Sequence, residues 1–184
     1  MRKPLSEMTL AELWQLFPII LTEHQPCWAT WYAEEEALLR RTLPPEYALR
    51  IRHIGSTAIP GIYAKPIVDI LVETADDADL AQADALLACA GYRCMAAGAS
   101  RRSYNKGYTE EGFAERVFHL HLQPVSPAPE EILFRDYLRA HPEDARAYEA
   151  LKLSLCKRFE HDRDSYTAAK GDFVHAILCK ARGE

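Results

Sequence analysis

The order of apolar and polar positions along this 184-residue chain follows two different periods. Alternation of apolar and polar residues, or a short apolar run bounded by turn residues, predicts a β-strand, whereas apolar residues three and four positions apart predict a helix. A hairpin is expected between the last two strands, across residues 109–113, because Gly112 suits the turn. The predicted strands cover residues 48–54, 66–73, 92–96, 101–108 and 116–124.

Along the sequence, helices are predicted before, between and after the strands. Thr9 and Glu12 form a capping box at the start of the first helix. Pro44 ends the second, whose apolar face includes Trp28. Gly91 suits the C-terminal cap of the third. The predicted helices cover residues 9–17, 26–43, 76–89, 130–140, 142–158 and 162–181.

This order of elements indicates the fold class. Strands mixed with helices, followed by helices alone, predict an α/β or α+β fold: a mixed sheet flanked by helices, with a helical C-terminal layer. Residues 1–184 are expected to form a single domain. The alternative is a separate helical subdomain over residues 128–184. A three-helix piece of about 55 residues is marginally stable alone, which favours one domain.

Composition excludes several classes of protein. The net charge of −5 argues against general binding of nucleic acids, which needs a basic surface, but leaves room for a small anionic ligand. The five cysteines lack C-x-x-C spacing and predict neither a zinc framework nor a disulfide framework, so a reducing cytoplasm is expected. Because no run approaches about 20 apolar residues, no membrane span is expected.

Residues 53–73, with the sequence HIGSTAIPGIYAKPIVDILVE, carry the clearest chemical signal. Gly55 and Ser56 form a turn whose free backbone N–H groups suit a phosphate. Lys65 precedes the next strand, where its charge would neutralise a phosphate. Asp69 lies inside the apolar strand, and a carboxylate kept there usually binds a metal ion or pairs with a base. Such a turn followed by a strand aspartate is typical of sites that hold a nucleoside triphosphate and Mg²⁺.

Each of these residues has a plainer interpretation. Gly55 and Ser56 also suit an ordinary turn in which the serine caps a helix. Lys65 also suits a solvated position. Asp69 also suits a structural salt bridge to Arg52 or to another buried arginine.

Two histidines alternate with apolar residues along a later strand. His119 and His121 therefore project from one face of the sheet. If this strand neighbours Asp69, the three side chains predict a divalent-metal site, and imidazole would also serve as a general base. An aspartate with two histidines favours Mn²⁺, Zn²⁺ or Fe²⁺ over Mg²⁺, which prefers oxygen ligands. With the phosphate-type turn also considered, Mg²⁺ or Mn²⁺ is the expected ion and Zn²⁺ a further candidate. His53 is a candidate fourth member. Histidines held by hydrogen bonds within the sheet are the alternative.

Further basic and aromatic side chains are candidates for binding an anionic ligand. Arg101 and Arg102 are neighbours on a strand, so one of the two is expected to face the site. Residues 162, 166 and 170 recur every four positions and predict one stripe along the last helix, although such stripes also arise from packing between helices. The candidate contacts are Arg102, Arg135, Lys152, Tyr166 and Lys170.

The wording HIGSTAIPG and AKPIVDI resembles the GrpB family, a branch expected to share the nucleotidyltransferase fold. The resemblance extends through FHLHL, FRDYLRAHP, YEALK and DRDSYTAAK, and covers most of residues 18–180. It implies a nucleotidyltransferase-like sheet and binding of a nucleotide or another phosphorylated small molecule. Relatives fused to dephospho-coenzyme A kinase point towards adenine-nucleotide metabolism.

The chain departs from the usual nucleotidyltransferase pattern at one position. Such enzymes place two carboxylates two residues apart on the strand, whereas Leu71 stands two residues after Asp69. Three hypotheses follow: a metal-dependent nucleotidyltransferase, a non-catalytic nucleotide-binding module, and a histidine-centred metal-dependent enzyme. If this face lines a cleft, Leu71→Asp is expected to restore binding of divalent ions.

Overall fold

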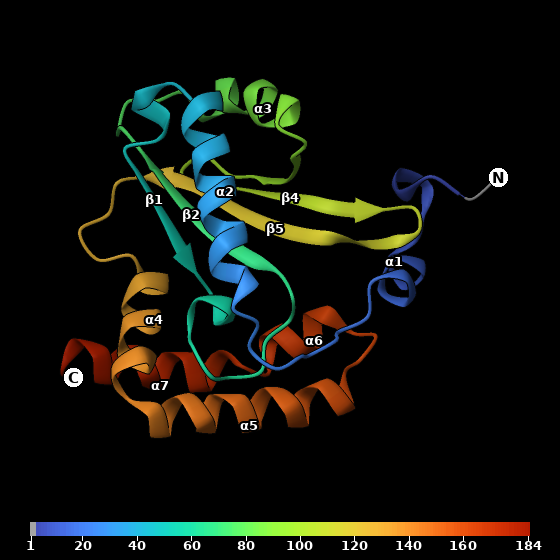
Figure 1. Ribbon diagram of the computed structural model, residues 1–184, viewed down its shortest axis with the longest axis vertical. Coiled ribbons are helices and arrows are strands. Elements are labelled where there is room, and N and C mark those ends of the chain that lie inside the picture. The colour runs from blue at the N-terminus through green and yellow to red at the C-terminus, as the bar shows by residue number, and fades with distance from the viewer. Residues whose placement is uncertain (1–2) are drawn as a thin grey trace.

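The computed structural model describes residues 3–184 and has a five-stranded mixed β-sheet at its centre (Figure 1). Its strand order is β1-β2-β5-β4-β3. β2 and β5 run parallel, and every other neighbouring pair runs antiparallel. The mixed α/β fold class expected from the sequence is confirmed. The strands are β1 (Arg50–Ile54), β2 (Val68–Thr74), β3 (Arg93–Ala97), β4 (Arg102–Thr109) and β5 (Gly112–Pro124).

The hairpin between β4 and β5 forms where the turn signal predicts it. Thr109 pairs with Gly112, so two residues connect the strands. Gly112 has a φ of +112°, which a residue with a side chain rarely adopts. Because the turn is this short, β5 begins at Gly112, earlier than the predicted residue 116.

One face of the sheet carries the larger core. Helices α2 (Cys27–Thr42) and α3 (Leu80–Cys89) cover this face (Figure 1). α3 begins later than residue 76 because the Asp79 carboxylate accepts a hydrogen bond from the Ala81 N–H at 3.0 Å and caps the helix there. The completely buried members of this core include Trp28, Leu39, Leu87, Leu120 and Leu122.

The C-terminal helices gather on the other side of the sheet and form the expected helical layer (Figure 1). A second apolar cluster, which includes Ile59, Leu138 and Ile177, holds them against the segment after β1. Whether residues 1–184 form one domain or two stays a prediction. The helices are α4 (Glu130–Ala140), α5 (Pro142–Arg158), α6 (Arg163–Ala168) and α7 (Gly171–Arg182).

The single helix predicted over residues 162–181 is wrong, because the chain turns between α6 and α7. Asp162 caps α6 by accepting a hydrogen bond from the Ser165 N–H at 3.0 Å, and Lys170 occupies the cap position of α7. Gly171 follows, and a glycine inside a helical pattern is a known breaker signal. Tyr166 and Lys170 therefore do not share one stripe.

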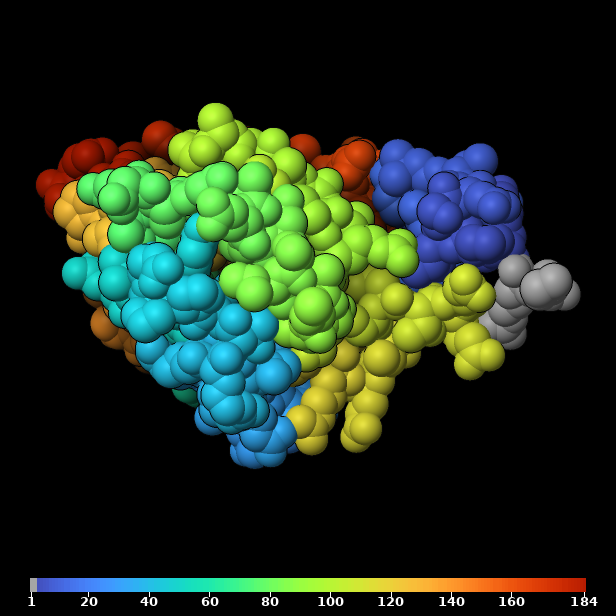
Figure 2. All heavy atoms as spheres, turned by 90° about the horizontal axis from the view of Figure 1, so that it is seen from above, coloured from blue at the N-terminus to red at the C-terminus, as the bar shows by residue number. Residues whose placement is uncertain are grey.

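A short N-terminal helix, α1 (Leu10–Leu16), lies beside the end of the β4–β5 hairpin (Figures 1 and 2). The predicted capping box is present, with Thr9 and Glu12 bonding to each other's backbone N–H. The buried Phe17 ring anchors the end of the helix, with its centroid 4.8 Å from that of Tyr108 and 5.0 Å from that of Phe113. Within residues 3–184, no helix is both long enough and apolar enough to cross a membrane.

Candidate functional site

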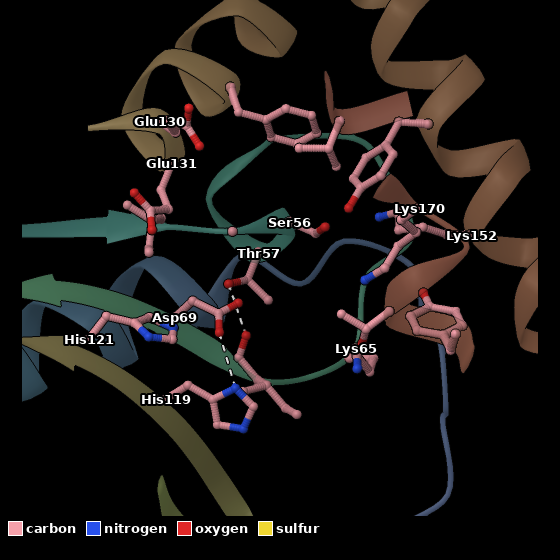
Figure 3. A pocket seen from close by; sticks show the side chains of 18 of the residues that line it. Ser56, Thr57, Lys65, Asp69, His119, His121, Glu130, Glu131, Lys152 and Lys170 are labelled. Atoms are coloured by element: carbon pink, nitrogen blue, oxygen red, sulfur yellow. Dashed lines mark hydrogen bonds and ion pairs between the residues drawn. The ribbon is translucent and has the colours of Figure 1, made fainter. Parts of the chain in front are cut away.

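A cavity of about 540 Å³ lies between the sheet and the C-terminal helices (Figure 3). This volume is typical of small-molecule sites. All predicted site residues except His53, Arg102 and Arg135 line it. These residues are Gly55, Ser56, Lys65, Asp69, His119, His121, Lys152, Tyr166 and Lys170.

The Gly55 turn brings the end of β1 against Asp69. Gly55 has a φ of +69°, and a Cβ atom there would lie 2.2 Å from Asp69 Oδ2. Glycine is therefore required both by the backbone conformation and by the close approach. A single helical turn, Ser56–Ala58, follows. The Thr57 hydroxyl ties this turn to the residue before β2 by donating to the Ile67 carbonyl at 3.1 Å.

His53 does not join the site. On β1 it faces α2, where its ring stacks on Tyr32 with centroids 4.9 Å apart. Its Nε2 lies 3.0 Å from the Thr57 hydroxyl oxygen; since that hydroxyl donates to Ile67, the imidazole is the donor here. Burial lowers the pKa of His53 to about 4, so the ring is neutral near pH 7.

Asp69 and His119 form a pair across the parallel strands β2 and β5, where they are direct neighbours. His119 Nδ1 lies 3.2 Å from Asp69 Oδ1, and His119 Nε2 lies 2.8 Å from the Tyr108 hydroxyl. Arg163 donates to that hydroxyl at 3.1 Å. The hydrogen bonds are consistent with one direction: Arg163 donates to Tyr108, Tyr108 donates to His119, and His119 donates to Asp69. This direction leaves Asp69 as the final acceptor.

The carboxylate of Asp69 is not sealed in an arginine salt bridge. Its side chain remains 27% exposed and faces the cavity (Figure 3). Burial alone would raise its pKa, but the hydrogen bond from His119, together with the positive charge of Lys65, lowers the pKa below its usual value. Asp69 is therefore ionised near neutral pH and available to a cation.

His121 faces the same cavity one step along the sheet. It neighbours Leu71 rather than Asp69, and its Nδ1 lies 3.2 Å from the Ser103 hydroxyl. Burial lowers its pKa, so the ring stays neutral near pH 7. Among residues 3–184, no three His, Cys, Asp or Glu side chains are grouped closely enough to hold a metal ion by themselves. The expected Asp69, His119 and His121 site is thus not assembled in this conformation.

Three lysines converge at the other end of the cavity from His121 (Figure 3). The Tyr166 ring lies beneath two of them, with its centroid 5.0 Å from Lys65 Nζ and 4.4 Å from Lys170 Nζ. Lys152 Nζ donates to the Tyr63 carbonyl and lies 4.8 Å from the centroid of the Tyr148 ring. Cations gathered this closely repel one another, which favours an anion between them.

Burial perturbs all three ammonium groups. Burial, together with the charges of Lys170 and Arg163, lowers the pKa of Lys65 to about 7. Burial and the charge of Lys170 lower the pKa of Lys152 to about 7 as well. Burial also lowers the pKa of Lys170, against the opposing charge of Asp69. These lysines therefore lose their protons at a lower pH than ordinary lysines do.

Two predicted contacts lie elsewhere. Arg102 was expected at the ligand, but it projects from the opposite face of the sheet and pairs with Asp84 at 2.6 Å. Its neighbour Arg101 faces the cavity side and pairs with Glu131 at 2.6 Å. Arg135 braces β1 by donating to the His53 carbonyl at 2.7 Å and does not line the cavity.

Leu71 occupies the position where nucleotidyltransferases usually carry a second carboxylate, and in this protein it belongs to the core. Leu71 is completely buried and packs with Ile54 and Ile132. The cleft assumed for Leu71→Asp is therefore absent at this residue. Glu73, further along the same face, is also buried; its Oε2 lies 3.2 Å from a nitrogen of Arg52.

A model of the family described as GrpB protein matches residues 18–180 of this chain. The chain belongs to the GrpB family. A 38% identical relative, the UPF0157 protein PA4798 of Pseudomonas aeruginosa, covers 85% of the chain, but the chain spans only 64% of that protein. The glutamate-rich protein GrpB of Alkalihalophilus pseudofirmus is 34% identical, with coverage of 87% of this chain and 94% of that protein.

Two further comparisons concern structure and domain context. The crystal structure of the conserved protein GrpB from Enterococcus faecalis has a TM-score of 0.73 and 30% sequence identity, and covers 88% of this chain and 96% of that one. A dephospho-CoA kinase of Mycolicibacterium paratuberculosis is 33% identical over 76% of this chain and 41% of that protein. The GrpB-like fold is therefore shown.

The sequence analysis of this GrpB chain missed Tyr108, which contacts His119, and Arg163, which donates to the Tyr108 hydroxyl. Strict alternation along β4 would turn Tyr108 to the same face as Lys106, away from His119. A register shift between them, at Gly107 with a φ of +88°, reverses its direction. An isolated glycine inside a strand pattern signals such a bulge. Arg163 carried no comparable signal, because its role depends on where α6 packs.

Proposed function

We propose that this GrpB-family protein binds a nucleotide or another phosphorylated small molecule together with a divalent metal ion, on a nucleotidyltransferase-like scaffold. The observation that carries the proposal is the gathering of Lys65, Lys152 and Lys170 in one cavity. None of the three forms an ion pair within residues 3–184, and Arg163 adds a fourth cation to the wall. Such a cluster suits the several negative charges of a di- or triphosphate.

Asp69 would contribute the protein's main ligand to the metal ion. Mg²⁺ is commonly bound by one or two carboxylates plus the phosphates of the substrate, so a cage made of protein groups alone is not required. The free face of the Asp69 carboxylate and the lysine cluster line the same cavity, which supports this arrangement. The metal ion would neutralise phosphate charge and orient the reacting group.

Two activities are compatible with this site. In a nucleotidyltransferase, the neutral His121 ring, which lines the same cavity, would take the proton of the attacking hydroxyl while the lysines hold the phosphates. In a non-catalytic nucleotide-binding module, the same lysines would bind without transfer. The burial of Leu71, where a second carboxylate would be expected, favours the module.

The match to a dephospho-CoA kinase makes adenine nucleotides and coenzyme A precursors the first ligands to test. The five free cysteines support a reducing, cytoplasmic setting.

Melting temperatures and calorimetry with ATP, dephospho-coenzyme A and tripolyphosphate, each with and without Mg²⁺ or Mn²⁺, test the proposal. A ligand at a hundred times its dissociation constant adds about 2.7 kcal/mol of stability. Stabilisation that needs the metal, with release of pyrophosphate, would support the transferase. Stabilisation without metal or product would support the module. If neither nucleotides nor tripolyphosphate bind, the proposal is wrong.

We expect Lys65→Met to weaken tripolyphosphate binding about tenfold or more, because one charge-assisted contact is lost. The same change should raise the stability of the ligand-free protein, because a buried charge that forms no ion pair is removed. The matched control is Lys157→Met, which replaces an exposed lysine on α5. It should alter neither property. Calorimetry and urea denaturation measure both. Unchanged binding in Lys65→Met would remove Lys65 from the site.

Binding of sulfate, whose charge is constant near neutral pH, should weaken as pH rises from about 6 to about 9. Lys65 and Lys152 have a pKa of about 7 in the folded protein, against an ordinary value of 10.5. Above pH 7 the folded protein therefore binds fewer protons than the unfolded chain. Through these two groups the stability of the ligand-free protein rises with pH in that interval.

A bound anion favours the charged lysines, so its affinity falls over the same interval. Sulfate-induced shifts in melting temperature, measured at each pH, check this prediction. The double variant Lys65→Met with Lys152→Met should flatten the dependence on pH. An affinity that stays constant in the wild-type protein would contradict the assignment.

A further inference from the structure

A second cavity, of about 700 Å³, lies between α1, the strands β3 and β4, and α6. It is separate from the lysine cavity but shares Arg163 and Thr167 with it, both from α6. Most of its wall is apolar, and basic groups stand among the apolar ones. Its wall includes Leu10, Leu13, Trp14, Arg93, Met95 and Arg163.

Helix α1 leaves its apolar face only partly covered. No residue within Leu10–Leu16 is buried, although Leu10, Leu13 and Trp14 all line the cavity. Leu10 is 55% exposed, and Met95 across the cavity is 58% exposed. They are two of the four most exposed large apolar side chains within residues 3–184. A short helix is stabilised mainly by packing of its apolar face, so a ligand in this space would complete that packing.

The charges in the wall select the kind of ligand. Arg163 donates to the neutral Tyr108 hydroxyl and forms no ion pair among the described residues, and neither does Arg93. Lys106 is already neutralised by Glu35 at 2.7 Å. Among residues 3–184, Asp164 is the only acidic side chain in the wall, and it is exposed. An acid group on the ligand would give the two guanidinium groups a counter-charge.

We propose that this second cavity binds an amphipathic anion: an aromatic or aliphatic molecule that carries a carboxylate, sulfonate or phosphate group. Its apolar part lies against Leu10, Trp14 and Met95, and its acid group is bound by Arg163 and Arg93. The site does not depend on the function of the lysine cavity. Because Arg163 also donates to Tyr108, a ligand here contacts the chain of hydrogen bonds that ends at Asp69.

Titration with anilinonaphthalene sulfonate, a fluorescent aromatic sulfonate, tests this inference on the full chain. We expect saturable binding at one site, with energy transfer from tryptophan. Leu10→Asp and Met95→Asp should each weaken binding about tenfold or more, because each removes apolar contact and adds a repelling charge. Both side chains are exposed, so both variants should remain folded. Leu49→Asp replaces an apolar residue that is 49% exposed outside this cavity and should leave binding unchanged.

Two further measurements examine the acid group. Arg93→Gln should weaken the sulfonate but not its uncharged analogue N-phenylnaphthylamine, since only the sulfonate needs the guanidinium. Binding of tripolyphosphate should be the same in Met95→Asp as in the wild type, which separates this site from the lysine cavity. If Leu10→Asp and Met95→Asp bind the probe as well as the wild type, or if Lys65→Met weakens it instead, the inference is wrong.

Discussion

Replacing Gly55 by alanine should destabilise the protein by about 3 kcal/mol or more and abolish binding of any metal–phosphate ligand. Two causes add. The φ of +69° with a ψ of −173° is a conformation that side chains strongly disfavour. The new Cβ would also lie 2.2 Å from Asp69 Oδ2, so the carboxylate must move. That movement breaks the pairing with His119 and displaces the proposed metal ligand.

Gly61→Ala is the matched control. Gly61 also has a positive φ, of +77°, but a Cβ there would meet no atom within 4 Å. It therefore measures the backbone cost alone, about 1–2 kcal/mol. Urea denaturation of both variants, with NMR titration of His119, separates the two causes. If Gly55→Ala costs no more than Gly61→Ala, the contact with Asp69 is not important for stability.

Local sequence patterns predicted the elements well because each pattern has a direct physical cause. The alternation of Phe118, Leu120 and Leu122 with His119 and His121 describes β5, whose apolar residues pack into the main core. The capping box of α1 and the turn at Gly112 were likewise predicted from residues next to one another in the sequence. The break between α6 and α7 was missed because the apolar residues keep their helical spacing through it. The backbone, however, leaves the helical path between Ala168 and Gly171.

The arrangement of the site was only partly predictable, because it depends on which strands pair. Alternation required one of Arg101 and Arg102 to face the cavity, but the register of β4 decided in favour of Arg101. The direct pairing of Asp69 with His119 likewise follows from β2 and β5 being parallel neighbours, which no local signal specifies. Tyr108 reached the histidine only through the bulge at Gly107.

The lysine cluster combines a local and a long-range signal. Lys65 follows the Gly55–Ser56 turn closely in the sequence, so a local pattern marked it as a phosphate contact. Lys152 lies in α5 and Lys170 at the N-terminal cap of α7, so their approach to Lys65 depends on how these helices pack. Burial disfavours the charged form of these lysines and so lowers their pKa. A fold that keeps such groups sacrifices stability for binding, which is typical of functional sites.

The second large effect concerns Leu71. Leu71→Asp should destabilise the protein by about 4 kcal/mol or more, rather than restore a two-metal site. Leu71 is completely buried against Ile54 and Ile132, so the change removes packing and buries a carboxylate that no cation of the cavity neutralises. A total stability of about 5–15 kcal/mol is usual for a domain, so a large fraction would be lost. The expectation that this face is an open cleft holds for Asp69 but not for Leu71.

Leu71→Ala separates the two contributions to that loss. It removes the packing without adding a charge and should cost about 2–5 kcal/mol, so the excess in Leu71→Asp reports the buried carboxylate. Urea denaturation gives both values, and calorimetric titration with Mn²⁺ shows whether the new carboxylate reaches a metal ion. A Leu71→Asp protein as stable as the wild type, with tighter Mn²⁺ binding, would mean that the cavity extends to this residue in solution. That result would also support the hypothesis of a nucleotidyltransferase whose metal site uses two carboxylates on β2. The packing of Leu71 between β1 and α4 leads us to expect the opposite.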